Sequence, residues 1–290
     1  MANAGNAADA VAAARVGAEG IGLFRTELLF LDRDGEPTIN EQVELYKAVF
    51  EAMAGHKVVL RTLDAGSDKP VPFINAIDEE NPALGVRGWR LTRTANDVLD
   101  RQLQAVAKAA SQVTTDIWVM APMIDTAREA ADFATRARAL GIKHVGVMVE
   151  TPAAAIGADK VLAEVDFASL GTNDLTQYVM AADRLDSRLS DLTSTWHPAV
   201  LRTIGMAATA AGTQSKPIGV CGESAANPQL AAVLIGLGVT SLSMAPSALS
   251  EVRGFLAGVD RATCVRAANA VTNASSADEA KALAIEILGN

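Results

Sequence analysis

The sequence predicts an α/β fold, a (β/α)8 TIM barrel with extra C-terminal helices. Eight short apolar runs alternate with stretches of helical periodicity almost to the end of the chain. The chain has 290 residues, a usual length for such a barrel, and half of them are hydrophobic. Aromatic residues are few while alanine, valine and leucine are common, which is typical of helices that cover parallel strands.

The first half of the chain supplies four of the expected strands, each an apolar run bounded by polar or turn residues. Apolar residues at helical spacing predict a helix in each interval between them. The interval 64–93 is also long, polar and rich in turn residues, and long loops of this kind are more often functional than idle. The strands are expected at 2–4, 21–24, 58–60 and 117–121, and the helices at 7–17, 40–54 and 96–113.

The second half repeats the pattern four more times and then adds helices. Prolines near the first turn mark the starts of three helices, since proline lacks the N–H that a first turn leaves unpaired anyway. The tail after Asp260 predicts one or two extra helices, with a cap at 275–278. The strands are expected at 145–149, 167–170, 218–220 and 241–244, and the helices at 126–140, 152–165, 198–211, 228–237 and up to about residue 256.

Bulk properties exclude several classes of function. The net charge of −9 argues against a nucleic-acid surface, since phosphate binding needs a basic face. No apolar run approaches the roughly 20 residues that a membrane-spanning helix needs, so we expect no membrane insertion. Two cysteines make no disulfide framework, and the N-terminus lacks the pattern of a signal peptide. These features favour a cytoplasmic protein.

Polar residues follow several of the apolar runs directly. The run 167–170 stops at Gly171 and is followed by a Thr-Asn-Asp triplet that contains Asn173 and Asp174. Because the carboxyl ends of parallel strands meet at one end of a barrel, we expect the residues at these positions to converge. They are Arg25, Arg61, Glu150, Asp174 and Cys221.

Glu150 and Asp174 are candidate metal ligands. They follow neighbouring strands, and Mg²⁺ prefers a few carboxylates together with water and substrate oxygens. Either carboxylate alone is equally well explained as a solvated loop residue or a helix cap. The presence of both at strand ends, beside several arginines, favours a magnesium site.

Arg25, Arg61, Arg87 and Lys69 are candidate ligands for an anion. A guanidinium group offers a bidentate fork to a phosphate or a carboxylate, so these residues together suit a substrate that carries both. The alternative is that an arginine simply pairs with a nearby acid. Two such local pairs are open, Arg25 with Glu27 and Arg61 with Asp64.

Cys221 lies in a Val-Cys-Gly-Glu segment at a strand end. At an active-site mouth, a thiol with a pKa near ~8.5 acts as a proton donor. The alternative is a small buried hydrophobic residue, the usual case for a lone cysteine. For Cys264, in the terminal helical region, we adopt that alternative.

These motifs, taken in order, resemble enzyme I of the bacterial phosphoenolpyruvate:sugar phosphotransferase system (phosphoenolpyruvate-protein phosphotransferase), in its C-terminal phosphoenolpyruvate (PEP)-binding domain. Several blocks in the right order make a specific signal, and the resemblance runs through nearly the whole chain. The blocks are GIGLFRTELLF at 20–30, RTLDAGSDK at 61–69, NPALGVR at 81–87, MVETP at 148–152, GTNDLTQY at 171–178, DR at 183–184 and CGE at 221–223.

The resemblance implies a (β/α)8 barrel and assigns roles to the candidate residues. Glu150 and Asp174 would ligate Mg²⁺, and Cys221 would protonate the enolpyruvate carbon once the phosphoryl group leaves. The residues implied to bind the phosphate and carboxylate of PEP are Arg25, Arg61, Lys69, Asn173 and Arg184, with Arg87 in support.

The resemblance also implies partners. The family passes the phosphoryl group to a histidine on a separate N-terminal domain and from there to the histidine-containing phosphocarrier protein. None of the three histidines here lies in that domain's motif, so we expect residues 1–290 to be a single PEP-binding domain without the phosphohistidine domain. A homodimer is implied as well. Two other hypotheses stay open: the C-terminal domain of a pyruvate phosphate dikinase or PEP synthase, and a non-catalytic PEP-sensing module.

Overall fold

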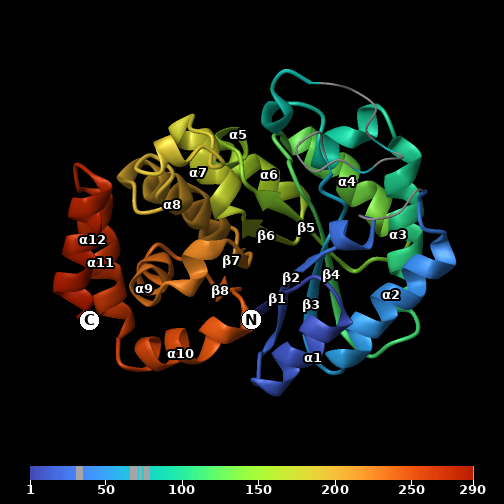
Figure 1. Cartoon of the computed structure of the whole chain (residues 1–290), viewed down its shortest axis with the longest axis horizontal. Helices are drawn as coiled ribbons and strands as arrows, with labels where there is room; N and C mark the ends of the chain where they lie inside the picture. The colour runs from blue at the N-terminus through green and yellow to red at the C-terminus, as the bar shows by residue number, and fades with distance from the viewer. Residues whose placement is uncertain (31–34, 66–70, 72–73, 75–78, 290) are drawn as a thin grey trace.

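The chain folds into a closed barrel of parallel strands. The structure is a computed structural model that describes residues 1–30, 35–65, 71, 74 and 79–289. In that part of the chain the strands form one parallel sheet in sequence order (Figure 1). They are β1 (Ala2–Ala4), β2 (Gly20–Arg25), β3 (Lys57–Arg61), β4 (Asp116–Ala121), β5 (His144–Val149), β6 (Phe167–Leu170), β7 (Ile218–Val220) and β8 (Ser241–Leu242).

The first and last strands meet and close the sheet. The backbone N–H of Asn3 donates to the carbonyl of Met244 at 2.7 Å, and the N–H of Met244 donates to the carbonyl of Met1 at 3.3 Å. Ala2 and Met244 also form a parallel bridge. The predicted (β/α)8 barrel is therefore confirmed.

Side chains alternate between the helices outside the barrel and its interior, because successive residues of a strand point to opposite faces. In β1, Ala2 and Ala4 are buried in the outer core, while Asn3 lies between them and faces the interior. An inner apolar cluster fills the barrel separately from the outer core. Its buried members are Leu23, Val59, Met120, Met148, Phe167 and Cys221.

Several helices begin at a polar residue that caps the first turn. Thr38 and Thr126 each form a reciprocal capping box, with Glu41 and Glu129 respectively, which satisfies backbone N–H groups that a first turn leaves free. The helices are α1 (Ala7–Arg15), α2 (Ile39–Ala52), α3 (Asn96–Ala110), α4 (Ala127–Ala139), α5 (Pro152–Ile156), α6 (Ala158–Glu164), α7 (Thr172–Met180), α8 (Pro198–Thr213), α9 (Pro228–Gly236), α10 (Leu249–Ala257), α11 (Arg261–Thr272) and α12 (Ala277–Leu288).

Three elements differ from the sequence expectations. The helix expected at 152–165 is two helices, α5 and α6, which meet at Gly157. The last strand is shorter than expected, since β8 ends at Leu242 and Met244 makes only an isolated bridge. Helix α7 was not expected at all. Its first turn buries Thr172 and Asp174, so polar residues occupy positions where a helix normally shows apolar ones.

The tail after Asp260 forms two helices, in agreement with the one or two that were predicted. They lie together on the outside of the barrel, where α11 packs against α9 and α12 (Figure 1). Ser276 caps α12, as the residues at 275–278 predicted. Among the described residues, none of the helices combines the length and apolar character that crossing a bilayer requires.

Candidate active site

The barrel places the polar strand-end residues on one rim. Arg25 and Arg61 are the last residues of β2 and β3, and Glu150 follows β5 directly. Cys221 follows β7 directly, and Asp174 lies in the first turn of α7, which begins one residue after β6 ends. All strands are parallel, so these positions share the carboxyl-terminal end of the barrel, where barrel enzymes build their active sites.

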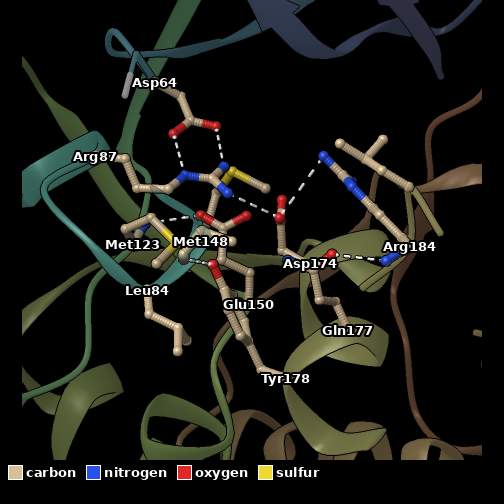
Figure 2. Close-up of polar contacts among 12 residues, drawn as sticks. Asp64, Leu84, Arg87, Met123, Met148, Glu150, Asp174, Gln177, Tyr178 and Arg184 are labelled. Carbon is tan, nitrogen blue, oxygen red and sulfur yellow. Dashed lines mark hydrogen bonds and ion pairs between the residues drawn. The ribbon is translucent and has the colours of Figure 1, made fainter. Parts of the chain in front are cut away.

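Arg87 is the centre of a buried network of ion pairs (Figure 2). Its Nε and Nη2 donate to the two carboxylate oxygens of Asp64 at 3.2 and 2.8 Å, and its Nη1 donates to Oδ1 of Asp174 at 3.1 Å. Burial alone would lower the pKa of Arg87, but Asp64 and Asp174 outweigh burial and raise that pKa. Arg87 therefore stays charged and ties Asp174 to the loop after β3.

Arg61 belongs to the same network. Its Nη2 donates to Oε1 of Glu27 at 2.7 Å, and its Nη1 lies 3.1 Å from Oδ2 of Asp64. The local pair of Arg61 with Asp64 is thus present, whereas Glu27 pairs with Arg61 rather than with Arg25. Arg25 is exposed and makes no ion pair or side-chain hydrogen bond with any residue that the structure describes. It is available to an external anion.

Glu150 is fully buried beside this network (Figure 2). Its Oε1 accepts a hydrogen bond from the backbone N–H of Met123 at 2.7 Å, while its Oε2 has no hydrogen-bond partner among the described residues. Burial, and then the charges of Asp174 and Asp64, raise the pKa of Glu150 to about 7. An anionic Glu150 therefore needs a positive partner at Oε2.

Two backbone features make room for Glu150. Met123, which supplies the hydrogen bond, has φ 55°, a left-handed conformation that residues other than glycine rarely adopt. Gly171 lies against the other oxygen: a Cβ at this position would lie 2.5 Å from Oε2 of Glu150. Only glycine fits at position 171 without moving Glu150.

Arg184 approaches Asp174 from the loop after α7. Its Nη2 lies 3.8 Å from Oδ1 of Asp174, and its backbone N–H donates to Oε1 of Gln177 at 3.0 Å (Figure 2). The side chain of Arg184 is 28% exposed, in contrast to the buried Arg87. Arg184 is thus the more accessible of the two arginines that contact Asp174.

The loop after β7 is fastened to the first turn of α7. Oδ1 of Asn173 accepts from the backbone N–H of Glu223 at 3.3 Å, and the hydroxyl groups of Thr172 and Ser224 lie 2.7 Å apart. A Cβ at Gly222 would lie 1.9 Å from the Thr172 hydroxyl, so this close approach requires glycine. The turn that carries Asp174 and the loop that begins at Cys221 therefore form one surface.

The Cys221 thiol is buried at the top of the inner apolar cluster. Its Sγ donates a weak hydrogen bond to the carbonyl of Leu170 at 3.7 Å. Burial raises the pKa of Cys221 to about 11. This pKa is above the value near ~8.5 of a free cysteine, so the thiol keeps its proton at neutral pH. Cys264 is a buried residue of α11, a C-terminal helix that packs against α9 and α12 on the outside of the barrel.

Some residues of the site gave no clear signal in the sequence. The sequence suggested Glu27 only as a partner of Arg25, assigned no role to Tyr178 within the block 171–178, and gave no indication of Met123. The Tyr178 hydroxyl donates to the carbonyl of Ala83 and so connects α7 to the segment that carries Arg87. A tyrosine one turn after Asp174 on the same helix face is the signal that points to it. Lys69 lies outside the described residues.

The carboxylates suit a hard divalent cation. Within the described residues, no three side chains of histidine, cysteine, aspartate or glutamate form a ready-made metal cluster. Two carboxylates that follow adjacent parallel strands, with one buried oxygen that has no partner among the described residues, match the needs of Mg²⁺, which takes its remaining ligands from water and substrate. The residues present therefore fit this metal.

Comparison with known proteins identifies the family. The sequence model described as "PEP-utilising enzyme, PEP-binding domain" matches residues 1–261. The chain is 50% identical to the phosphoenolpyruvate-protein phosphotransferase of Streptomyces coelicolor over 290 residues, covering 99% of the chain and 52% of the relative. The protein of the same name from Haloferax volcanii is 42% identical, covering 96% of the chain and 52% of the relative. The chain thus spans about half the length of these relatives.

Solved structures agree on the fold. An HpcH/HpaI aldolase/citrate lyase family protein from Burkholderia cenocepacia superposes with a TM-score of 0.52 at 14% identity, covering 89% of the chain and 92% of that protein. An HpcH/HpaI aldolase from Desulfitobacterium hafniense gives a TM-score of 0.50 at 15% identity, covering 89% and 90%. Identity this low supports the fold alone.

Proposed function

This chain belongs to the PEP-utilising enzymes, whose PEP-binding domain it matches over most of its length, and we propose that it is the PEP-binding domain of a phosphoenolpyruvate-protein phosphotransferase. The observation that carries the proposal is the grouping at one rim: two carboxylates, several guanidinium groups and a protonated, buried thiol. Phosphoryl transfer depends mainly on positioning and charge stabilisation, which such a grouping supplies.

The cationic residues of the rim are proposed to bind the two anionic groups of PEP. Arg25 is exposed and without a partner in the described structure, and Arg184 is partly exposed beside Asp174, so both are free to reach a ligand. The buried Nε of Arg61 has no hydrogen-bond partner among the described residues. Arg87 is engaged on both sides and supports the others. Lys69 and Asn173 complete the proposed set.

Glu150 and Asp174 are proposed to hold Mg²⁺, which when bound would offset the negative charge of the phosphoryl group and of the developing enolate. The chain prepares for this in two ways. Met123 holds one oxygen of the Glu150 carboxylate, Gly171 leaves room for the other, and Arg87 holds the carboxylate of Asp174.

The proposed reaction uses Cys221 as the proton donor. The bond between phosphorus and the enol oxygen breaks, the phosphoryl group forms a bond to a histidine nitrogen of another domain, and the electron pair stays on the oxygen. Carbon 3 of the enolate then takes the proton from the Cys221 sulfur, which gives pyruvate and a thiolate. The thiolate recovers a proton from water. A thiol whose pKa burial raises to about 11 holds that proton until the enolate forms.

The partners follow from this role and remain proposals. We propose that residues 1–290 form a single PEP-binding domain that works with a phosphohistidine domain and, through it, with the histidine-containing phosphocarrier protein of sugar transport. A homodimer and a cytoplasmic setting remain predictions. Phosphorylation of the carrier protein by the full-length protein with PEP and without nucleotide would distinguish this role from that of a dikinase.

The test for the isolated chain is exchange of the methyl protons of pyruvate in D₂O with Mg²⁺, followed by proton NMR. We expect exchange by the unmodified chain and a loss of at least about 100-fold in Cys221→Ala, the usual contribution of a general acid–base group. Cys264→Ala is the matched control and should exchange like the unmodified chain. No exchange in the unmodified chain would contradict catalysis and would favour a PEP-sensing module.

A further inference from the structure

We propose that Asn3 is a positioning residue that holds the backbone of Cys221 and so aims its thiol at the rim. The inference rests on the proposed role of Cys221 as proton donor. Asn3 belongs to β1, at the seam where the barrel closes, and none of the sequence motifs considered above contains it.

The Asn3 side chain bridges two other strand ends inside the barrel. Its Nδ2 donates to the backbone carbonyl of Cys221 at 3.3 Å, and its Oδ1 accepts from the hydroxyl of Ser243 at 2.7 Å. A backbone carbonyl only accepts, so the amide nitrogen must face Cys221, which leaves the amide oxygen for Ser243. The Cys221 carbonyl thus sets the orientation of the amide, and the hydrogen bond from Ser243 holds the side chain in place.

Cys221 needs this hold because it lies beyond the last paired residue of its strand. Strand β7 pairs with β8 only through Gly219 and Val220. On the other side, the Cys221 N–H donates to the Leu170 carbonyl at 3.2 Å, and the thiol contacts the same carbonyl. The next residue, Gly222, has no side chain to restrict its backbone. Without Asn3, the carbonyl of Cys221 has no hydrogen-bond partner among the described residues, and the loop is held only further along, where Glu223 and Ser224 contact Asn173 and Thr172.

An asparagine at position 3 lowers the stability of the fold unless its hydrogen bonds compensate, which suggests that it has a role in the site. Leu23, which is paired with Asn3 on the neighbouring strand β2, belongs to the inner apolar cluster, and asparagine is disfavoured in strands. A polar side chain inside a barrel requires hydrogen bonds to offset its loss of water, and among the described residues those of the Asn3 side chain go to Ser243 and Cys221. Within the same part of the chain Asn3 has no hydrogen bond to the arginine–carboxylate network, so its loss should affect proton transfer rather than ligand binding.

The test combines two readouts in a Cys264→Ala background, where Cys221 is the remaining thiol. The first is the rate at which iodoacetamide alkylates Cys221. The second is the exchange of pyruvate methyl protons, measured as a maximum rate and a KM for pyruvate. For Asn3→Ala we expect a maximum rate lower by about 10- to 100-fold, the cost of misplacing a reacting group by about 1 Å. KM should change less than about twofold, because the binding groups are untouched, and alkylation should become faster.

Two further variants keep the test sharp. Asn3→Asp preserves size and the acceptor for Ser243 but cannot donate to Cys221, so it should behave like Asn3→Ala. Ser241→Ala is the matched control. Ser241 of β8 also has an inward-facing hydroxyl, but the described structure shows no hydrogen bond from it to Asn3 or Cys221. Both readouts should therefore stay unchanged in this variant.

Wild-type exchange and alkylation in Asn3→Asp would overturn the inference, since only the volume of Asn3 would then matter. A parallel rise in KM and fall in rate would overturn it too, because it would indicate general disruption of the rim. If the unmodified chain shows no exchange, the proposed function fails, while the alkylation rates still decide whether Asn3 positions Cys221.

Discussion

Replacing Asp64 by asparagine tests the ion-pair network that organises the rim. Asp64 is 1% exposed and accepts both Nε and Nη2 of Arg87, and one of its oxygens lies 3.1 Å from Nη1 of Arg61. Removing one partner of a buried pair leaves the other charge without compensation, which costs about 3–5 kcal/mol. Asp174 and Glu27, which also pair with Arg87 and Arg61 in the described structure, do not replace an acceptor that both arginines share.

The free energy of unfolding from urea titration measures this cost, and Tm should fall by roughly 10 °C. Asp100→Asn is the control. Asp100 pairs with Arg136 at 3.3 Å at the surface, where an ion pair contributes about 1 kcal/mol or less. A loss below about 1 kcal/mol in Asp64→Asn would refute the reasoning, because the network would then be no stronger than a surface pair.

Three further predictions follow from the rim. Gly171→Ala places a Cβ 2.5 Å from the Glu150 carboxylate and should cost about 1–3 kcal/mol by urea titration; unchanged stability would show that Glu150 moves freely. The pKa of Cys221 is raised from 9.0 to about 11, so its contribution to stability is complete below pH 9 and is lost as pH rises toward 11. The free energy of unfolding of the unmodified chain should therefore fall by up to about 3 kcal/mol relative to Cys221→Ala over that range, and a constant difference would contradict burial of the thiol. Tyr178→Phe removes the hydrogen bond to Ala83, so the backbone amides at 81–87 should exchange faster with solvent. The free energy of opening of this segment, measured by hydrogen exchange, should fall by about 0.5–1.5 kcal/mol. Equal exchange rates would show that α7 does not hold this segment.

The fold was predictable because it follows from the hydrophobic periodicity of the sequence and the order of the predicted strands and helices. Parallel strands covered by helices read as short apolar runs, and their alternation with helical segments specifies the barrel without knowledge of any contact. The rim was predictable for the same reason, since a residue that follows a buried strand must lie at its carboxyl end. Arg61, Glu150 and Cys221 were found in this way.

The rest depends on contacts between segments far apart in the sequence. Helix α7 was missed because Asp174 and Thr172 are buried in its first turn, which hides the apolar pattern of a helix. Met123 contributes a backbone N–H and an unusual φ, neither of which can be predicted from its side chain. The pairing of Glu27 with Arg61 joins the segment after β2 to the end of β3, so proximity in sequence favoured Arg25 instead.

The most direct measurement of the central claim is calorimetric binding of PEP to the chain with and without Mg²⁺, compared with Asp174→Ala. The claim is that Asp174 and Glu150 hold the metal through which PEP binds. We expect Mg²⁺-dependent binding of PEP by the unmodified chain and none by Asp174→Ala, whose fold can be checked by circular dichroism. Equal Mg²⁺-dependent affinity in a folded Asp174→Ala would contradict the assignment of the metal to this rim.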